Sequence, residues 1–180
     1  MPLTPSRKII TVFGSSKPVE GDEEYQSAHE LGFQLAKNGF DVCTGGFLGV
    51  MEAASNGAVQ AGGKAIGVTV DLWGSKPNRF VTKEIRCKSL FERIQTLINY
   101  GNAYVVLQGG TGTLLELAAV WEFSNKGLMD HKPILCHSAV WKEIVSVLNK
   151  QMEYEGRGID LVKPFDTVNE IVTYLKKHFY

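Results

Sequence analysis

The 180-residue sequence lacks the features that mark several classes of protein. Its longest purely apolar stretches, such as AYVVL at 103–107, fall far short of the roughly 20 residues that cross a bilayer. Its 19 basic and 19 acidic side chains give a net charge of zero, so no overall positive field attracts a phosphate backbone. The sequence therefore predicts a protein with neither a membrane span nor a nucleic-acid partner.

Cysteine and histidine are also scarce. Cys43, Cys87 and Cys136 are far apart, form no C-x-x-C pair and lie in no cluster with metal-ligand spacing. We therefore expect reduced packing cysteines, no metal and no Ser-His-Asp triad. The N-terminal segment MPLTPSRKII contains no apolar core of the length that a secretory signal needs, which makes the cytoplasm the expected location.

The residues that are present alternate between two periods. Short β-branched runs at 8–14, 40–46, 61–70, 103–108 and 132–137 predict strands, and 80–87 predicts a short extra one. Helical patterns lie between them, and a final helix is expected at 167–179. This alternation indicates an α/β fold with a doubly wound, mainly parallel sheet flanked by helices, in a single domain. The helix at 114–127 is apolar on most of its circumference, so we expect it to pack against both the sheet and another subunit.

Three of the predicted strands run into glycine-bearing turns that open helices: FGSS at 13–16, TGGFLGVME at 44–52 and QGGTGTLLE at 108–116. In a parallel sheet these turns share one edge, where backbone N–H groups at helix N-termini bind anions. A tight turn alone also explains any one of the glycines, but three turns together favour a phosphate-bearing ligand. The candidate binding residues are Gly14, Ser15, Gly45, Gly46, Gly49, Met51, Glu52, Gly109, Gly110, Thr111, Gly112 and Thr113.

Other polar residues have two interpretations each. Thr113 and Glu116 form a T-x-x-E pair, which is either a helix-capping box or a carboxylate in the first turn that faces the ligand. Glu52 either faces the ligand or merely complements the helix dipole. Arg93 is a surface group or a fork for phosphate, and Asn78 is a ligand donor or a loop residue.

The motifs resemble those of the LOG (LONELY GUY) family. The family's P-G-G-x-G-T-x-x-E appears as QGGTGTLLE, its T-G-G-x-x-G-x-M-E-A-A as TGGFLGVMEAA, and its opening as VFGSSK. The resemblance implies a Rossmann-like fold, a homodimer or larger assembly, no cofactor, and hydrolysis of a nucleoside 5′-monophosphate such as AMP or a cytokinin riboside 5′-monophosphate. It also implies that Glu116 and Arg93 are catalytic and that Gly109 to Thr113 hold the phosphate.

The chain departs from this family at two positions near the motif residues. Ile94 replaces the lysine after the arginine, and Gln108 replaces the proline before the double glycine. A lost cation weakens a phosphate pocket, so a non-catalytic binding protein, like the molybdenum cofactor carriers, stays open as the alternative. A third reading, a DprA-like nucleic-acid protein on a related fold, is disfavoured by the zero net charge.

Overall fold

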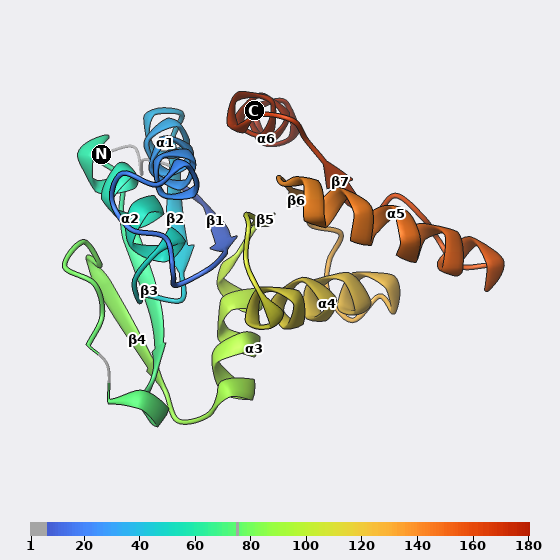
Figure 1. Cartoon of the computed structure of the whole chain (residues 1–180), viewed down its shortest axis with the longest axis horizontal. Coiled ribbons are helices and arrows are strands. Elements are labelled where there is room, and N and C mark those ends of the chain that lie inside the picture. Colours follow the sequence, from blue (N-terminus) through green and yellow to red (C-terminus); the bar gives the residue numbers. More distant parts are fainter. Residues whose placement is uncertain (1–6, 75) are drawn as a thin grey trace, which may run out of the picture.

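The fold is built on one parallel sheet, seen in a computed structural model that describes residues 7–74 and 76–180. Within those residues seven strands lie in the order β4-β3-β2-β1-β5-β6-β7, and every neighbouring pair is parallel (Figure 1). The strands are β1 (Lys8–Phe13), β2 (Phe40–Thr44), β3 (Ala65–Val70), β4 (Lys83–Cys87), β5 (Ala103–Val106), β6 (Ile134–Cys136) and β7 (Val162–Pro164). The α/β, Rossmann-like, doubly wound class predicted from the sequence is confirmed.

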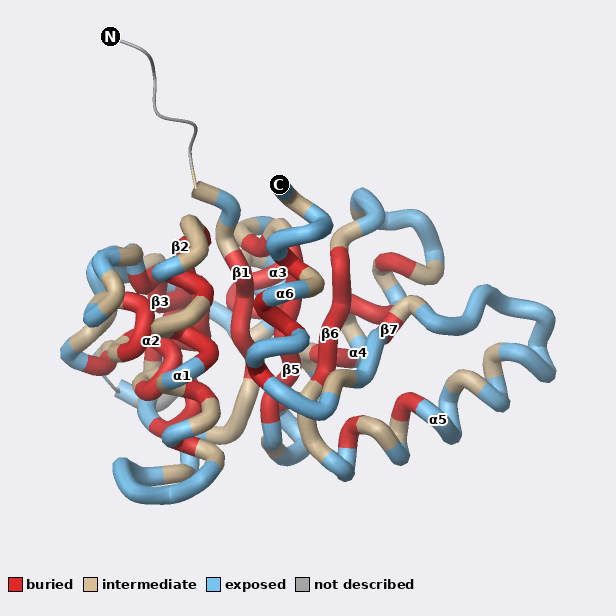
Figure 2. Tube along the Cα trace, turned by 90° about the horizontal axis from the view of Figure 1, so that it is seen from above, coloured by how far each residue is buried: buried red, intermediate tan, exposed pale blue. Residues whose placement is uncertain are grey.

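Helices cover both faces of the sheet. On one face α1 (Glu23–Lys37), α2 (Val50–Gln60) and α6 (Val168–Phe179) pack on the strands through one apolar cluster. On the other face α3 (Leu90–Tyr100), α4 (Thr111–Asn125) and α5 (Ala139–Tyr154) pack through a second. Buried residues concentrate along the strands between these layers, as Figure 2 shows. The two-layer cover explains why the central strands are continuous apolar runs rather than alternating ones.

The strand order reverses between β1 and β5. From β1 the chain winds outward through β2 and β3 to β4, and it then crosses back by way of α3 to β5 and winds the other way. Ligands of open α/β sheets bind at such a switch point, beyond the carboxyl ends of the strands. Two of the three glycine turns, 13–16 and 108–116, lie directly at this point, and the third follows the adjacent β2.

Two strands extend the sheet beyond the five that the main alternation predicted. The short extra strand expected within 80–87 is β4, and it pairs in parallel with β3. Strand β7 was not predicted, because it has only three residues and two of them, Lys163 and Pro164, are exposed, so it carries no apolar pattern. Helix α1 ends as expected before Gly39, whose φ of 87° lies in the left-handed region that favours glycine.

Helix α4 confirms half of the prediction made for it. Leu117, Val120 and Trp121 are buried against the sheet, whereas Leu114 and Leu115 on the other side are 38% and 42% exposed. The capping-box interpretation of Thr113 and Glu116 is wrong. The helix begins at Thr111 with Gly110 as its N-cap, which places Thr113 inside the helix and Glu116 beyond the first turn.

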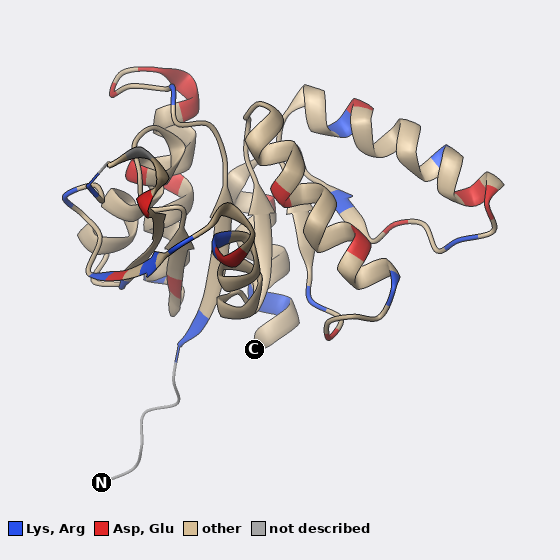
Figure 3. Ribbon diagram, turned by 90° about the horizontal axis from the view of Figure 1, so that it is seen from below, with Lys and Arg blue, Asp and Glu red and all other residues tan. Residues whose placement is uncertain are grey.

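Charges of both signs are interspersed over the molecule (Figure 3). Among residues 7–74 and 76–180, no helix is long and apolar enough to span a membrane. In the same part of the chain, no three His, Cys, Asp or Glu side chains gather where a metal ion would bind. The three cysteines are buried and free, as expected for packing residues.

Candidate functional site

The turns that follow β1 and β5 are tied together at the switch point. The Ser15 N–H donates to the Gln108 carbonyl at 3.0 Å, and the Ser15 carbonyl accepts from the Val50 N–H at 2.8 Å. Gly14 allows this approach, because a Cβ there would lie 2.4 Å from Cγ1 of Val50. The first glycine turn thus links the third turn to the start of α2, and it brings predicted binding residues from distant parts of the sequence to one edge.

The second turn, after β2, depends on its glycines for conformation and space. Gly46 and Gly49 have φ values of 78° and 69°, and a Cβ on Gly49 would lie 2.4 Å from the Ser15 carbonyl oxygen. Gly45 has no room for a side chain, because a Cβ there would lie 1.8 Å from Nη2 of Arg93. The sequence suggested that these glycines let a ligand come close to the backbone. At Gly45 the group that comes close is the Arg93 side chain of the protein itself.

Arg93 is a buried residue of α3, not the surface group that its position alone also allowed. It is 6% exposed, and its Nε donates to the Val68 carbonyl at 2.8 Å. Its Nη2 donates to the Gly45 carbonyl at 3.2 Å and lies 3.9 Å from Sδ of Met51. Burial lowers the pKa of Arg93, although the neighbouring Glu116 carboxylate opposes this. The guanidinium is therefore fixed from several sides by backbone carbonyls.

Phe47 adds an aromatic contact that the sequence reasoning missed. Its ring centroid lies 5.6 Å from Cζ of Arg93, within the range of a cation–π interaction. The available signal was the aromatic residue inside the glycine motif TGGFLG. Only the tertiary structure pairs that ring with an arginine from another helix.

Glu116 completes the centre of the site. Its Oε1 lies 3.6 Å from Nη1 of Arg93, and both side chains are largely buried, with 12% and 8% exposed. Burial raises the pKa of Glu116 to about 7, although the attraction of Arg93 lowers it. A carboxyl group with this pKa exchanges protons near neutral pH, which suits acid–base chemistry. The two residues that the sequence singled out as catalytic thus form one buried pair.

The third turn presents an open helix N-terminus. Gly110 is the N-cap of α4, where no side chain caps the helix, and Thr111 and Gly112 are exposed. Gly109 is required by packing, because a Cβ there would lie 2.1 Å from the Thr113 hydroxyl oxygen. A helix start with exposed N–H groups is a common binding place for phosphate.

Glu52 and Asn78 lie on neighbouring elements but differ in what they contact. Glu52 is half-buried in the first turn of α2, where it complements the helix dipole. Burial raises the pKa of Tyr25, and the Glu52 carboxylate raises it further. Asn78 is 6% exposed and binds the carbonyls of Gly46 and Phe47. Its amide therefore serves the second glycine turn.

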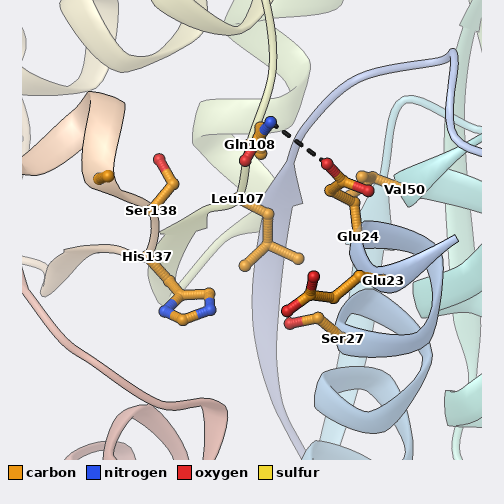
Figure 4. A pocket seen from close by; sticks show the side chains of 9 residues that line it. Glu23, Glu24, Ser27, Val50, Leu107, Gln108, His137 and Ser138 are labelled. Carbon is orange, nitrogen blue, oxygen red and sulfur yellow. Dashed lines mark hydrogen bonds between the residues drawn. The ribbon is translucent and has the colours of Figure 1, made fainter.

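A cavity of about 200 Å³ opens beside Gln108, between the starts of α1 and α5 (Figure 4). Gln108 donates to Glu24 at 3.3 Å across its rim, and the His137 ring points into it. The remaining lining residues are Glu23, Ser27, Val50, Leu107, Ser138 and Ala139. Neither Arg93 nor Glu116 lines this cavity, so it is separate from the buried pair.

Ile94, which stands where the resembling family has lysine, belongs to the core. It is 7% exposed and packs in the apolar cluster between the sheet and α3. The side chain at position 94 therefore lies in the core. Its change from lysine to isoleucine does not by itself remove a cation from the glycine turns.

Comparison with known proteins finds relatives of two kinds and a more distant neighbour. A curated cytokinin riboside 5′-monophosphate phosphoribohydrolase of Rhodococcoides fascians is 27% identical over 135 residues, which cover 73% of this chain and 68% of that protein. The molybdenum cofactor carrier protein of Chlamydomonas reinhardtii is 26% identical with a TM-score of 0.75, over 95% of this chain and 97% of that one. DNA processing protein A of Helicobacter pylori, at 15% identity and a TM-score of 0.63 over 97% of this chain and 83% of that one, shares the fold alone.

The profile of the SLOG cluster4 family matches residues 7–156, which include all three glycine turns, Arg93 and Glu116. The resemblance to LOG-type proteins that the motifs indicated is confirmed by this match, and the chain belongs to the SLOG cluster4 family.

Proposed function

We propose that this protein hydrolyses the N-glycosidic bond of a nucleoside 5′-monophosphate, such as AMP or a cytokinin riboside 5′-monophosphate, to free base and ribose 5-phosphate. The observation that carries the proposal is the buried Arg93–Glu116 pair beside an open helix N-terminus. The names of the LOG-type relatives support the same reaction class. No cofactor is part of the proposal.

The chemistry assigns one task to each part of the site. The N–H groups at the start of α4, from Gly110 to Thr113, hold the phosphate. Glu116 stabilises the positive charge that develops on the sugar and orients the attacking water, while Arg93 holds that carboxylate in place. With its pKa raised to about 7, Glu116 is present in both protonation states at neutral pH. In its protonated form Glu116 donates its proton to the departing base as the C1′–N bond breaks, and the resulting carboxylate then takes a proton back from the attacking water.

The second candidate is a phosphate-ligand carrier that binds without cleavage. It is favoured by the likeness to the molybdenum cofactor carrier protein, which covers nearly the whole chain. Both candidates use the same glycine turns. They differ in whether Glu116 performs chemistry.

Incubation of the pure protein with a panel of nucleoside monophosphates distinguishes them, with release of base and ribose 5-phosphate followed by chromatography. We expect release by the wild type and a fall in rate of about 10²- to 10⁴-fold in Glu116→Ala. Arg93→Lys is the companion variant, because lysine keeps the charge but not the planar fork. Absence of release from every nucleotide, together with thermal stabilisation by one of them, would establish the carrier instead.

A homodimer is part of the proposal. Leu114 and Leu115 on α4 and Val147 and Leu148 on α5 are exposed apolar side chains, and the two helices cover the same face of the sheet. The far end of α5 extends away from the sheet (Figures 1 and 2), which lets it reach a second copy. Sedimentation velocity tests this, and a monomer at micromolar concentration contradicts it. The cytoplasm is the proposed location, since three buried free cysteines suit a reducing compartment.

A further inference from the structure

Asn78 lies on the segment that follows the 3-10 turn Asp71–Trp73, and its polar groups are used within the protein. Its Nδ2 donates to the Gly46 carbonyl at 3.1 Å and to the Phe47 carbonyl at 2.8 Å. Its Oδ1 accepts from the Phe80 N–H at 3.1 Å, and its own N–H donates to the Gly46 carbonyl at 2.8 Å. Both amide hydrogens are thus engaged, which does not suit the ligand donor that the sequence suggested.

The Gly46–Phe47 segment needs such a partner. Gly46 has a φ of 78° and packs closely on β3, where a Cβ would lie 3.1 Å from Cα of Gly67. This backbone belongs to neither a strand nor a helix. Buried carbonyls left without a donor are costly. Asn78 supplies the donors, and it thereby fixes where the segment lies.

This segment and the adjacent Gly45 hold Arg93. The Gly45 carbonyl accepts from Nη2, and the Phe47 ring lies against the guanidinium. The remaining backbone contact, from Nε to Val68, comes from β3. A guanidinium is planar and rigid, so a shift of two of these contacts moves Nη1 relative to Glu116. Asn78 itself touches neither side chain of the pair.

We propose that Asn78 is a positioning residue: by fixing the Gly46–Phe47 segment it sets the orientation of Arg93 toward Glu116. The expected effect on kcat rests on the proposed hydrolase activity, whereas the effect on the orientation of Arg93 does not. In this proposal Asn78 does not bind the ligand.

The test is Asn78→Asp, with Asn102→Asp as its matched control. Aspartate keeps the size of the side chain and the acceptor for Phe80 but replaces the donor with an oxygen that repels the two carbonyls. Asn102 also binds backbone, since its Oδ1 accepts from the Ile9 N–H at 2.9 Å, but at the opposite edge of the sheet. Because that bond needs only an acceptor, aspartate preserves it.

The first readout is hydrogen exchange at the Nη2 hydrogens of Arg93, one of which donates to the Gly45 carbonyl, followed by ¹H–¹⁵N NMR at low temperature. We expect exchange about tenfold faster in Asn78→Asp, because the hydrogen bond from Nη2 of Arg93 to the Gly45 carbonyl is weakened, and no change in Asn102→Asp. Equal exchange in Asn78→Asp and the wild type would overturn the inference. Hydrogen exchange at Arg93 can be measured even if the wild type cleaves no nucleotide. A failure of the positioning role can therefore be distinguished from a failure of the proposed hydrolase function.

The second readout is the division between kcat and KM, measured well below the melting temperature of each variant. Misplaced catalytic groups lower kcat by about 10- to 100-fold in Asn78→Asp, with KM nearly unchanged. A raised KM with normal kcat would instead mean that Asn78 binds substrate directly, against the inference. If Asn78→Asp does not fold, Asn78→Ser replaces it. Its hydroxyl can donate one bond, so we expect intermediate effects in both readouts, and wild-type values in both would refute the role.

Discussion

Replacement of Glu116 by glutamine should change how the stability of the protein depends on pH. Burial raises the pKa of Glu116 from its ordinary value of 4.5 to about 7, so folding favours its protonated form. The two values differ by about 2.5, and each pKa unit corresponds to about 1.4 kcal/mol, which gives a total of about 3 kcal/mol. The side chain is only 12% exposed, so solvent screening reduces this value little.

The direction follows from proton binding. Below pH 4.5 Glu116 is protonated in both the folded and the unfolded chain, and the stabilisation is fully present. Between pH 4.5 and about 7 the folded state keeps the proton while the unfolded state loses it, so the free energy of unfolding falls as the pH rises. Glutamine imitates the protonated form and does not titrate. Arg93 stays charged in both proteins across this range.

Urea denaturation of the wild type and Glu116→Gln, from about pH 4 to about pH 8, measures the effect. We expect the wild type to lose about 3 kcal/mol relative to the variant over this range, because the titrations of all other groups are shared and cancel. The comparison uses the change with pH rather than the absolute difference, which also contains the altered contact with Arg93. Parallel stability curves would refute a buried Glu116 with a raised pKa.

Three further substitutions probe the surroundings of the pair. Gly45→Ala places a Cβ 1.8 Å from Nη2 of Arg93, so we expect kcat to fall by about 100-fold in steady-state assays, and an unchanged kcat would contradict the contact. Ile94→Lys restores the family's residue inside the core and should destabilise the protein by about 3 kcal/mol in urea, whereas a stable and faster enzyme would mean that this position faces the site. Gln108→Pro removes only an exposed hydrogen bond to Glu24 and should alter stability by less than about 0.5 kcal/mol in thermal melts; a larger loss would show that this bond stabilises the α1 contact.

Local pattern was sufficient for most elements of the fold. The apolar strands β1, β2, β3 and β5 were predicted because parallel strands buried on both faces read as continuous β-branched runs. Strand β7 gave no such signal, since only Val162 of its three residues is buried. The T-x-x-E pair alone could not separate a capping box from a carboxylate that faces a ligand, because a capping motif depends on where the helix begins. Here Gly110, three residues before Thr113, takes the cap position.

The sequence by itself determined the fold class, the family and the three glycine turns, because these depend on periodicity and on glycines at fixed spacing. It also named Arg93 and Glu116, through the resemblance to the LOG family. Only the tertiary structure decided their properties. Arg93 comes from α3 and Glu116 from α4, and their burial together produces the raised pKa of the carboxyl group. The role of Asn78 was likewise decided by folding, since the two carbonyls that accept from its Nδ2 lie more than 30 residues away in the chain. Desolvation and long-range hydrogen bonds exist only after the elements pack, so no local pattern reports them.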